Sequence, residues 1–253
     1  DSLVVSGTTG ESPTLTDDEK EALFRFAVNR AAGRCKIIAG TGSNDTAHSI
    51  ELTRLAEEAG VDGVLLVAPY YNKPNQEGLY RHFKAIAEST SLPVMLYNVP
   101  GRTGVSLSVE TTLRLARLPN VFATKECASV EQMTEIVKDA PEGFVLYSGD
   151  DALTLPALAV GAQGIVSVAS HVVGADMAKL IEAYSEGRVA EAAKINARCY
   201  PFFKGLFHCP HPVPNPVAVK YALTQKGLPV GGVRLPLVEA SEDEAAFIRK
   251  LLG

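Results

Sequence analysis

This sequence of 253 residues contains little cysteine. It also has no excess of positive charge and no long hydrophobic run. The four cysteines (Cys35, Cys127, Cys199 and Cys209) are too few and too scattered for a disulfide framework, so we expect a reducing, cytoplasmic setting. Lys and Arg number 24 against 29 Asp and Glu, with no basic run, which argues against a nucleic-acid partner. No apolar stretch reaches about 18 residues, so we expect no membrane partner. No signal peptide is recognisable at Asp1.

What the sequence does contain is typical of a globular protein with a sizeable core. Hydrophobic residues make up 46% and charged residues 21%, which excludes disorder, collagen and a disulfide-dense miniprotein. A domain averages about 150 residues, but α/β barrels often form one unit of about 250 residues. The length is therefore compatible with a single large α/β domain.

Short apolar runs alternate with amphipathic segments along much of the chain. Seven runs are predicted to be strands that are buried on both faces. They are Leu3–Ser6, Lys36–Ala39, Gly63–Val67, Pro93–Tyr97, Val121–Thr124, Phe144–Tyr147 and Gly164–Val168. Among the helices between them, Thr16-Asp-Asp-Glu19 predicts a capping box and Ser129-Val-Glu-Gln132 a second N-terminal cap. Beyond about Glu186 the strands stop and helices are predicted. These helices are Val189–Phe207, Pro216–Gln225 and Ser241–Leu252.

Seven successive strand–helix units predict an α/β fold with a parallel sheet. A closed (β/α)8 barrel needs eight units, and we expect the missing one to precede Asp1 in a longer protein. An open, doubly wound sheet is the alternative. However, Gly40-Thr-Gly-Ser-Asn-Asp45 lacks the third glycine of a dinucleotide-binding loop, and no P-loop occurs. We predict a (β/α)8 TIM barrel without its first unit over residues 1–187, and a C-terminal helical subdomain over residues 188–253.

Lys125 is the main candidate for catalysis, because it ends a predicted strand and the active sites of barrels lie at strand ends. It follows Val121-Phe-Ala-Thr124, so its amine would lie at the barrel mouth among apolar side chains. Burial lowers the pKa of a lysine and makes the neutral amine available to attack a carbonyl group. The alternative is a structural ion pair with Glu126 or another acid.

Polar residues at neighbouring strand ends could complete such a site. Tyr70, Tyr71 and Tyr97 are expected on the same rim, where Tyr97 could move a proton or simply pack. The Gly7-Thr-Thr-Gly10 turn offers backbone N–H groups and hydroxyls to a carboxylate. Arg102 could hold a second carboxylate or lie free on a surface loop.

Two further clusters contain residue types that bind metals. His208-Cys-Pro-His211 has no second pair at the spacing of a zinc site, so we predict a structural loop there. Asp150-Asp151 lies between a strand and a helix, which favours an N-cap. We predict no metal site.

Four motifs in this order carry a resemblance to a known family: Gly7-Thr-Thr-Gly-Glu11, Tyr70-Tyr-Asn-Lys-Pro74, Tyr97-Asn-Val-Pro-Gly-Arg-Thr-Gly104 and Thr124-Lys-Glu126. They resemble the dihydrodipicolinate synthases, which belong with N-acetylneuraminate lyase among the pyruvate-dependent class I aldolases. The resemblance extends to Arg234-Leu-Pro-Leu237. It implies a lyase that condenses pyruvate with L-aspartate 4-semialdehyde to 4-hydroxy-tetrahydrodipicolinate in diaminopimelate and lysine synthesis. It also implies that no metal or organic cofactor is needed.

The resemblance implies roles for individual residues. Lys125 would form the imine with pyruvate, and Thr9 would hold the pyruvate carboxylate. Tyr97 would move protons together with Thr8 and Tyr71. The counterpart of Tyr71 reaches into the site of a neighbouring subunit, so the resemblance implies a homo-oligomer, at least a dimer and usually a tetramer.

Two more groups of residues follow from the resemblance. Arg102 would bind the carboxylate of the aldehyde substrate, and Gly149 and Val166 would line the pocket through their backbones. A cleft for the inhibitor L-lysine would lie at the dimer interface, near Ser12, Asn44, His48 and Tyr70. Lysine-sensitive members have a carboxylate at the position of His48. Because an imidazole cannot replace that anion for an ammonium ligand, we expect weak inhibition by lysine or none.

Two other functions stay open at this point. A sialic acid or 2-keto-3-deoxy-sugar-acid lyase would use the same imine, but a sugar tail needs hydroxyl-rich partners where Arg102 stands. A non-catalytic protein that binds pyruvate or lysine would have no need for the imine lysine and all three proton-relay residues together.

Overall fold

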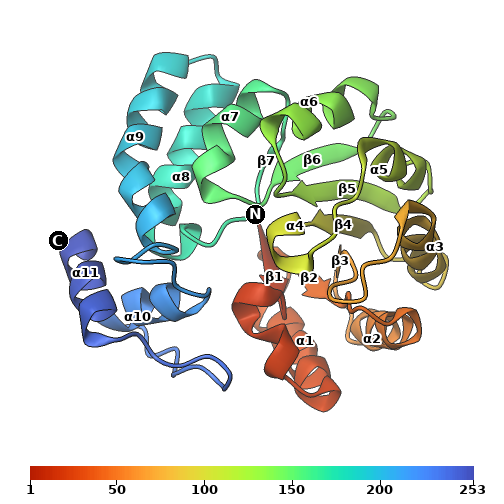
Figure 1. The fold of residues 1–253 in the computed structure, drawn as a ribbon, viewed down its shortest axis with the longest axis horizontal. Helices are drawn as coiled ribbons and strands as arrows, with labels where there is room; N and C mark the ends of the chain where they lie inside the picture. The colour runs from red at the N-terminus through yellow and green to blue at the C-terminus, as the bar shows by residue number, and fades with distance from the viewer.

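The computed structural model describes residues 1–253, and most of the chain surrounds one curled sheet (Figure 1). The seven strands follow one another across the sheet in chain order, β1 to β7. They span Ser2–Val5, Lys36–Gly40, Gly63–Val67, Val94–Asn98, Val121–Glu126, Val145–Ser148 and Gly164–Ile165. All neighbouring pairs are parallel. The predicted parallel α/β arrangement is confirmed, whereas the closed eight-stranded barrel stays a prediction.

The seventh strand is the one that differs most from its prediction. Six predicted strands agree with the structure to within two residues at either end. The run Gly164–Val168, in contrast, forms a strand only over Gly164–Ile165. The backbone N–H groups of Val168 and Ala169 donate to the Asp151 carboxylate, at 3.2 and 2.9 Å, instead of to a neighbouring strand. The Asp151 side chain, from the 3-10 turn after β6, therefore ends β7 early.

Helices connect the strands, and most of them lie around the outside of the curled sheet (Figure 1). In the first part of the chain they are the 3-10 turns Thr8–Gly10 (η1), Ser12–Thr14 (η2) and Asp151–Leu153 (η3), with α1 (Asp17–Ala31), α2 (Thr46–Glu58), α3 (Gln76–Ala87), α4 (Pro100–Thr103), α5 (Val109–Leu115), α6 (Val130–Asp139) and α7 (Thr154–Ala159). The capping box of α1 is confirmed, because Thr16 and Glu19 exchange hydrogen bonds. The cap of α6 is also confirmed, since Ser129 accepts from the backbone of Gln132 at 3.1 Å. Each such cap stabilises its helix by about 1 kcal/mol.

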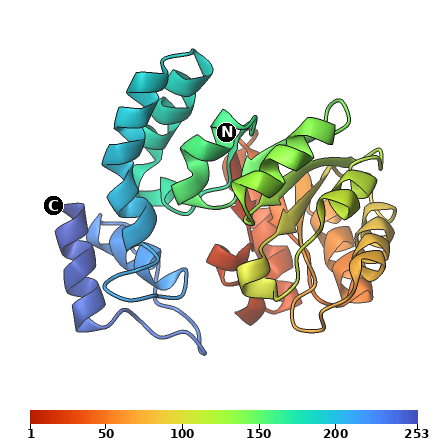
Figure 2. The same ribbon diagram turned by 45° about the horizontal axis from the view of Figure 1, so that its top comes forward.

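The last four helices lie beside the sheet rather than around it (Figure 2). They are α8 (Ser170–Ser185), α9 (Val189–Gly205), α10 (Val217–Gln225) and α11 (Glu242–Leu252). The three helices predicted beyond Glu186 are thus present. One apolar cluster joins them and includes Leu158, Phe203 and Ile248. The boundary at residues 187 and 188 stays a prediction, because this cluster contains residues from both sides of it.

The sheet is apolar on both faces. The larger cluster, which includes Phe24 and Phe83, lies between its outer face and the surrounding helices. A separate group fills the curled interior and consists of Ile38, Leu65, Met95, Tyr97, Val99 and Ala123. Since alternate residues of a strand share a face, Lys125 lies on the same face of β5 as Ala123. The interior group therefore surrounds the residues expected to carry the chemistry.

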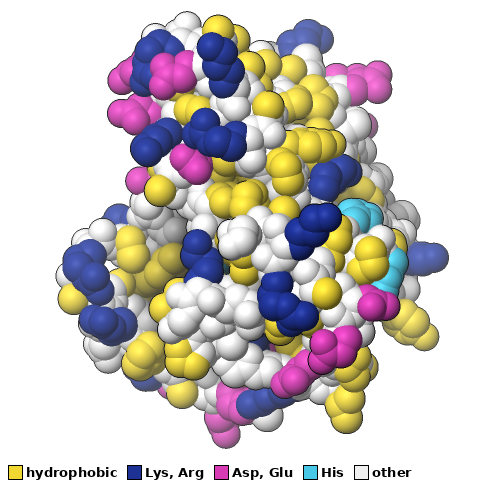
Figure 3. Space-filling view, turned by 90° about the vertical axis from the view of Figure 1, so that its left-hand side faces the viewer, with side chains coloured by type: hydrophobic (Ala, Val, Ile, Leu, Met, Phe, Trp, Pro, Cys, Tyr) yellow, Lys and Arg dark blue, Asp and Glu magenta, His cyan; other side chains and the backbone are white.

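None of the helices is both long enough and apolar enough to cross a lipid bilayer. On the side where α9 and α11 lie, basic and acidic side chains are interspersed with hydrophobic ones (Figure 3).

Candidate active site

Lys125 and Tyr97 lie side by side at the carboxyl ends of β5 and β4. They are partners in the register of the parallel pair. The Lys125 Nζ atom lies 4.1 Å from the centroid of the Tyr97 ring, a distance typical of a cation–π contact when the amine is protonated. The structure thus brings together the residue expected to form the imine and one of the three expected to move protons.

Burial is the main influence on the Lys125 amine, and it lowers its pKa from the ordinary value of 10.5. The charge of Arg102 acts in the same direction, whereas Cys127 and Asp151 act in the opposite one. The ion pair with Glu126, which the sequence left as an alternative, is not formed. The Glu126 carboxylate lies on the other face of β5 and accepts a hydrogen bond from another strand. Lys125 therefore forms no ion pair, although the Asp151 charge acts on its amine.

The Tyr97 phenol is also buried, with 7% of the residue exposed. Burial and the nearby Cys127 thiol raise its pKa above the ordinary value of 10.0, while Arg102 and Thr8 act in the opposite direction. Thr8 is carried by the turn η1, directly after β1. The phenol stays protonated at neutral pH, so it can donate one proton while its oxygen accepts another.

A cavity of about 570 Å³ opens beside Tyr97. Its lining includes residues expected in the catalytic site and in the inhibitor cleft. These are Thr8, Tyr97, Arg102, Ser12, His48 and Tyr70. The only acid in the lining is Asp17, against the two bases Lys20 and Arg102. This balance of charge favours an anionic ligand.

Six expected site residues are not part of the cavity lining. They are Lys125, Tyr71, Thr9, Gly149, Val166 and Asn44. Asn44 donates from its side chain to the Tyr70 carbonyl at 3.1 Å. Val166 donates from its backbone to the Ser148 carbonyl at 2.8 Å, and its side chain packs on the apolar interior group.

Thr9 is held by a residue that the sequence did not single out. Its hydroxyl oxygen accepts a hydrogen bond from Asn215 Nδ2 at 2.7 Å. The Thr9 hydroxyl hydrogen is therefore free for an acceptor such as a carboxylate. Asn215 lies between α9 and α10, so only the folded chain reveals the contact.

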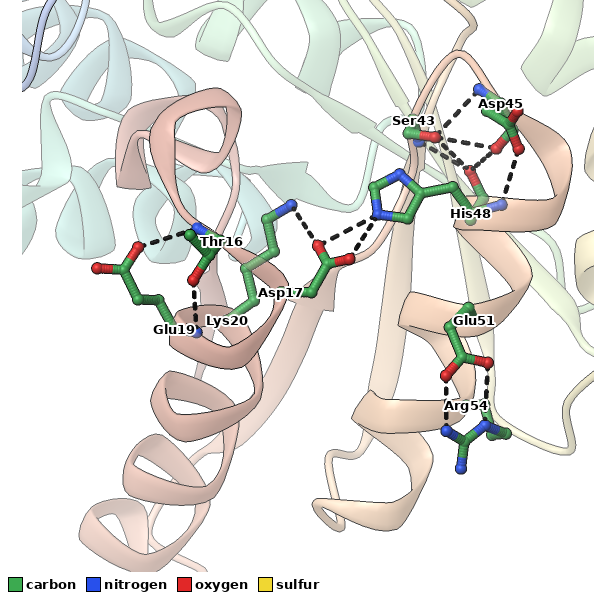
Figure 4. Close-up of polar contacts among 10 residues, drawn as sticks. Thr16, Asp17, Glu19, Lys20, Ser43, Asp45, His48, Glu51 and Arg54 are labelled. Carbon is green, nitrogen blue, oxygen red and sulfur yellow. Dashed lines mark hydrogen bonds and ion pairs between the residues drawn. The ribbon is translucent and has the colours of Figure 1, made fainter.

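Three polar side chains that line the cavity, those of Asp17, Lys20 and His48, form a cluster (Figure 4). His48 Nε2 lies 2.9 Å from the Asp17 carboxylate, and Lys20 Nζ lies 3.5 Å from the same carboxylate. The Lys20 side chain is only 8% exposed. The sequence analysis missed Asp17 and Lys20 because they lie on α1, whereas His48 lies on α2.

Tyr71 and Arg102 are two of the expected residues that are exposed. Tyr71 is 88% exposed and forms no hydrogen bond with Tyr97 or Thr8 of its own chain. Its φ of 74° is unusual for a residue with a bulky side chain. Arg102, in the short helix α4, is exposed at the cavity mouth and its guanidinium is unpaired. The structure therefore does not bring Tyr71 into the site of its own chain.

The two clusters that could have bound a metal have other partners. Asp150 caps η3 by accepting from the Ala152 backbone at 2.9 Å, which confirms the predicted N-cap. Asp151 accepts from Ser167 and from the backbone that follows it. His211 bonds to Glu244 at 2.9 Å.

Gly149 follows β6 and lies against the Lys125 side chain. A substitution at Gly149 therefore tests the placement of Lys125. A Cβ atom at this position would lie 2.8 Å from Lys125 Cε and would collide with the Cys127 thiol. We expect Gly149→Ala to displace Lys125 and to lower kcat by about 10²-fold, the cost of a misplacement of about 1 Å. Steady-state kinetics would measure this.

Gly174→Ala is the matched control, because its Cβ would meet only the Ser170 Cβ at 3.8 Å. That variant should keep the original rate. An unchanged kcat in folded Gly149→Ala would contradict the placement of Lys125 against this turn.

Comparison with known proteins places these observations in context. The model of the dihydrodipicolinate synthetase family matches residues 1–253. The 4-hydroxy-tetrahydrodipicolinate synthase of Bacillus velezensis is 61% identical over 254 residues, which cover 100% of this chain and 86% of that protein. Two solved structures superpose with a TM-score of 0.96. The dihydrodipicolinate synthase of Bacillus anthracis is 53% identical, and the match covers 99% of this chain and 85% of that one. The enzyme of Cyanidioschyzon merolae, with lysine bound, is 44% identical at the same coverage of both chains.

Proposed function

The chain belongs to the dihydrodipicolinate synthetase family, and we propose that it works through an imine between pyruvate and the Lys125 amine. Its activity is that of a 4-hydroxy-tetrahydrodipicolinate synthase, a lyase. The observation that carries the mechanism is the position of Lys125 Nζ, 4.1 Å from the Tyr97 ring centroid. There, burial lowers the pKa of the amine, and no carboxylate holds it in an ion pair.

The reaction begins when the neutral Lys125 amine attacks the pyruvate carbonyl and water leaves, which gives the imine. The protonated imine nitrogen acts as an electron sink, so a methyl proton can leave and an enamine forms. The enamine carbon then attacks the aldehyde of L-aspartate 4-semialdehyde, forming a carbon–carbon bond, and the aldehyde oxygen takes up a proton. Finally the substrate amine adds to the imine carbon and expels Lys125. This closes the ring and restores the free enzyme, so no step needs a metal or an organic cofactor.

Each of these steps moves a proton, and Tyr97 is the group placed to carry it. Thr8, which acts on the Tyr97 phenol, would extend the relay. We propose that the exposed Tyr71 completes it from a second copy of the chain. A homo-oligomer, at least a dimer and in the full assembly a tetramer, is therefore part of the proposal.

The substrate carboxylates would be held at two places. Thr9 has a free hydroxyl hydrogen for the pyruvate carboxylate, because its oxygen already accepts from Asn215. Arg102 has no partner at the cavity mouth and would pair with the carboxylate of the aldehyde substrate. Gly149 and Val166 would shape the pocket through their backbones.

The barrel architecture, the cellular location and the domain boundary belong to the same proposal. The curled order of β1 to β7 supports a (β/α)8 barrel architecture. The free state of all four cysteines supports a reducing, cytoplasmic location. The division into a barrel over residues 1–187 and a helical subdomain over residues 188–253 is also part of the proposal; α9, α10 and α11 lie beside the sheet, together with α8 (Figure 2).

The proposal is tested by trapping the imine. The protein is incubated with pyruvate, reduced with borohydride and digested, and the adduct is located by mass spectrometry. A mass increase of roughly 72 Da on Lys125, as expected for a reduced pyruvyl imine, would support the mechanism. An adduct on another lysine, or no adduct on folded protein, would refute it. Adding different aldehydes to pyruvate would then distinguish this synthase from a sugar-acid lyase, which the relatives do not favour.

Inhibition by L-lysine is expected to be weak or absent. The only carboxylate in the cavity lining, that of Asp17, is already paired with Lys20 and His48. The ammonium group of a free lysine would have to displace these groups, and an imidazole offers it no anion. An activity assay over a range of L-lysine concentrations checks this. Half-inhibition at micromolar lysine would show that the cluster does not block the cleft.

A further inference from the structure

A second pair of register partners lies directly behind the proposed imine pair. Asn98 follows Tyr97 on β4, and Glu126 follows Lys125 on β5, so the two are also opposite each other in the sheet. Successive side chains of a strand point to opposite faces, which places Asn98 and Glu126 on the outer face. Both are fully buried, with 0% exposed.

The Glu126 carboxylate is held entirely by donors. Asn98 Nδ2 lies 2.9 and 3.1 Å from its two oxygens. The backbone N–H of Ala128 donates at 2.8 Å and Gln132 Nε2 at 3.2 Å. A buried carboxylate is not needed to stabilise a sheet, since an apolar pair of the same volume is often as stable or more so. The hydrogen bonds instead fix the orientation of the Glu126 side chain relative to the groups that donate to it.

The amide of Asn98 is fixed in turn. Its oxygen accepts from the Leu107 backbone at 3.0 Å, and its Nδ2 group donates to Ser106 Oγ at 3.2 Å in addition to Glu126. Backbone bonds connect the same two residues to the loops of the site. Cys127 donates to the Asn98 carbonyl at 2.9 Å, and Gly149 donates to the Glu126 carbonyl at 2.8 Å. The bond between Asn98 and Glu126 therefore joins the strand ends that carry Tyr97 and Lys125.

We propose that Asn98 and Glu126 are positioning residues for the reaction: their bond holds the ends of β4 and β5 so that Tyr97 and Lys125 stay in contact on the opposite face. This inference rests on the proposed function, because the imine at Lys125 defines what is being positioned. Burial raises the pKa of Glu126 to about 7. Burying this carboxyl group therefore costs desolvation free energy. A role in holding the two strand ends together explains why the fold contains it.

Exchanging the donor and the acceptor tests the inference. Glu126→Gln would set a third amide N–H₂ group beside those of Asn98 and Gln132, and Asn98→Asp would set two carboxyl groups against each other. The double variant restores one donor and one acceptor across the strands. We expect each single variant to lower both kcat and the rate of borohydride trapping at Lys125 by about 10²-fold, with KM for pyruvate within about threefold. The double variant should recover about tenfold of each loss, since contacting residues couple.

A control and a milder variant keep the test decisive. Ile136→Val also alters the buried outer layer, so it should lower the melting temperature without changing kcat. If the single variants do not fold, Gln132→Leu removes one donor to Glu126 and should still slow trapping severalfold. Variants that lose stability but trap pyruvate at the original rate, or a double variant without recovery, would overturn this inference but leave the proposed function standing. Absence of an adduct in the unmodified protein would overturn the proposed function itself.

Discussion

Replacing Lys125 with methionine is expected to lower kcat by about 10⁴-fold or more, the scale seen when a covalent nucleophile is removed. Methionine matches the volume and the apolar surroundings of the lysine but has no amine, so the fold should tolerate it. Without the amine no imine can form, and neither the enamine nor the carbon–carbon bond can follow. The melting temperature should stay the same or rise, because an unpaired buried amine is costly. Steady-state kinetics, borohydride trapping and thermal unfolding measure the three effects.

The pH dependence of the unmodified enzyme follows from the same amine. Only neutral Lys125 attacks pyruvate, and burial holds its pKa below 10.5. The trapping rate should therefore rise with pH through that lowered pKa and reach its plateau before an ordinary lysine would lose its proton. Lys138→Met, on the exposed surface of α6, is the matched control and should keep the full rate. A trapping rate that rises only around pH 10.5 would contradict the lowered pKa.

The sequence was sufficient for those parts of the fold that depend on local pattern. The apolar runs at Gly63–Val67 and Val121–Thr124 predicted buried strands, because strands covered on both faces have no polar side. The capping boxes and caps were equally local, since Thr16 and Ser129 bond to residues three positions further on. The position of Lys125 at a strand end then followed from the order of the elements.

The residues that sequence reasoning missed depend on contacts between distant segments. The short β7 could not be predicted, because Asp151, in the turn η3 after β6, ends it. Glu126 was considered only as a partner of Lys125, although strand alternation places it on the other face. That signal was present in the sequence. In contrast, nothing in the sequence indicated that Asn215 would reach Thr9 or that Asp17 would reach His48.

Replacing Tyr97 with phenylalanine should have the second-largest effect, a loss in kcat of about 10²- to 10³-fold, as expected when a group that transfers protons is removed. Phenylalanine keeps the ring beside Lys125, so the geometry of the site and the binding of pyruvate should change little. KM for pyruvate is therefore expected to stay within about threefold, whereas every proton transfer becomes slower. Kinetics at saturating pyruvate, together with the rate of hydrogen exchange from the pyruvate methyl group, measure this.

Tyr147→Phe provides the matched control for this prediction, because Tyr147 is the register partner of Lys125 on the other neighbouring strand, β6. Tyr97 belongs to the apolar interior group, and Tyr147 packs against it. Only Tyr97 borders the cavity together with Thr8. If the Tyr97 phenol transfers protons, methyl exchange should slow in Tyr97→Phe and stay normal in Tyr147→Phe. Equal losses in the two variants would indicate that the phenols only pack the interior. A loss in carbon–carbon bond formation without a loss in methyl exchange would place Tyr97 after the enamine rather than before it. The two readouts therefore locate the proton transfer within the reaction as well as the residue that performs it.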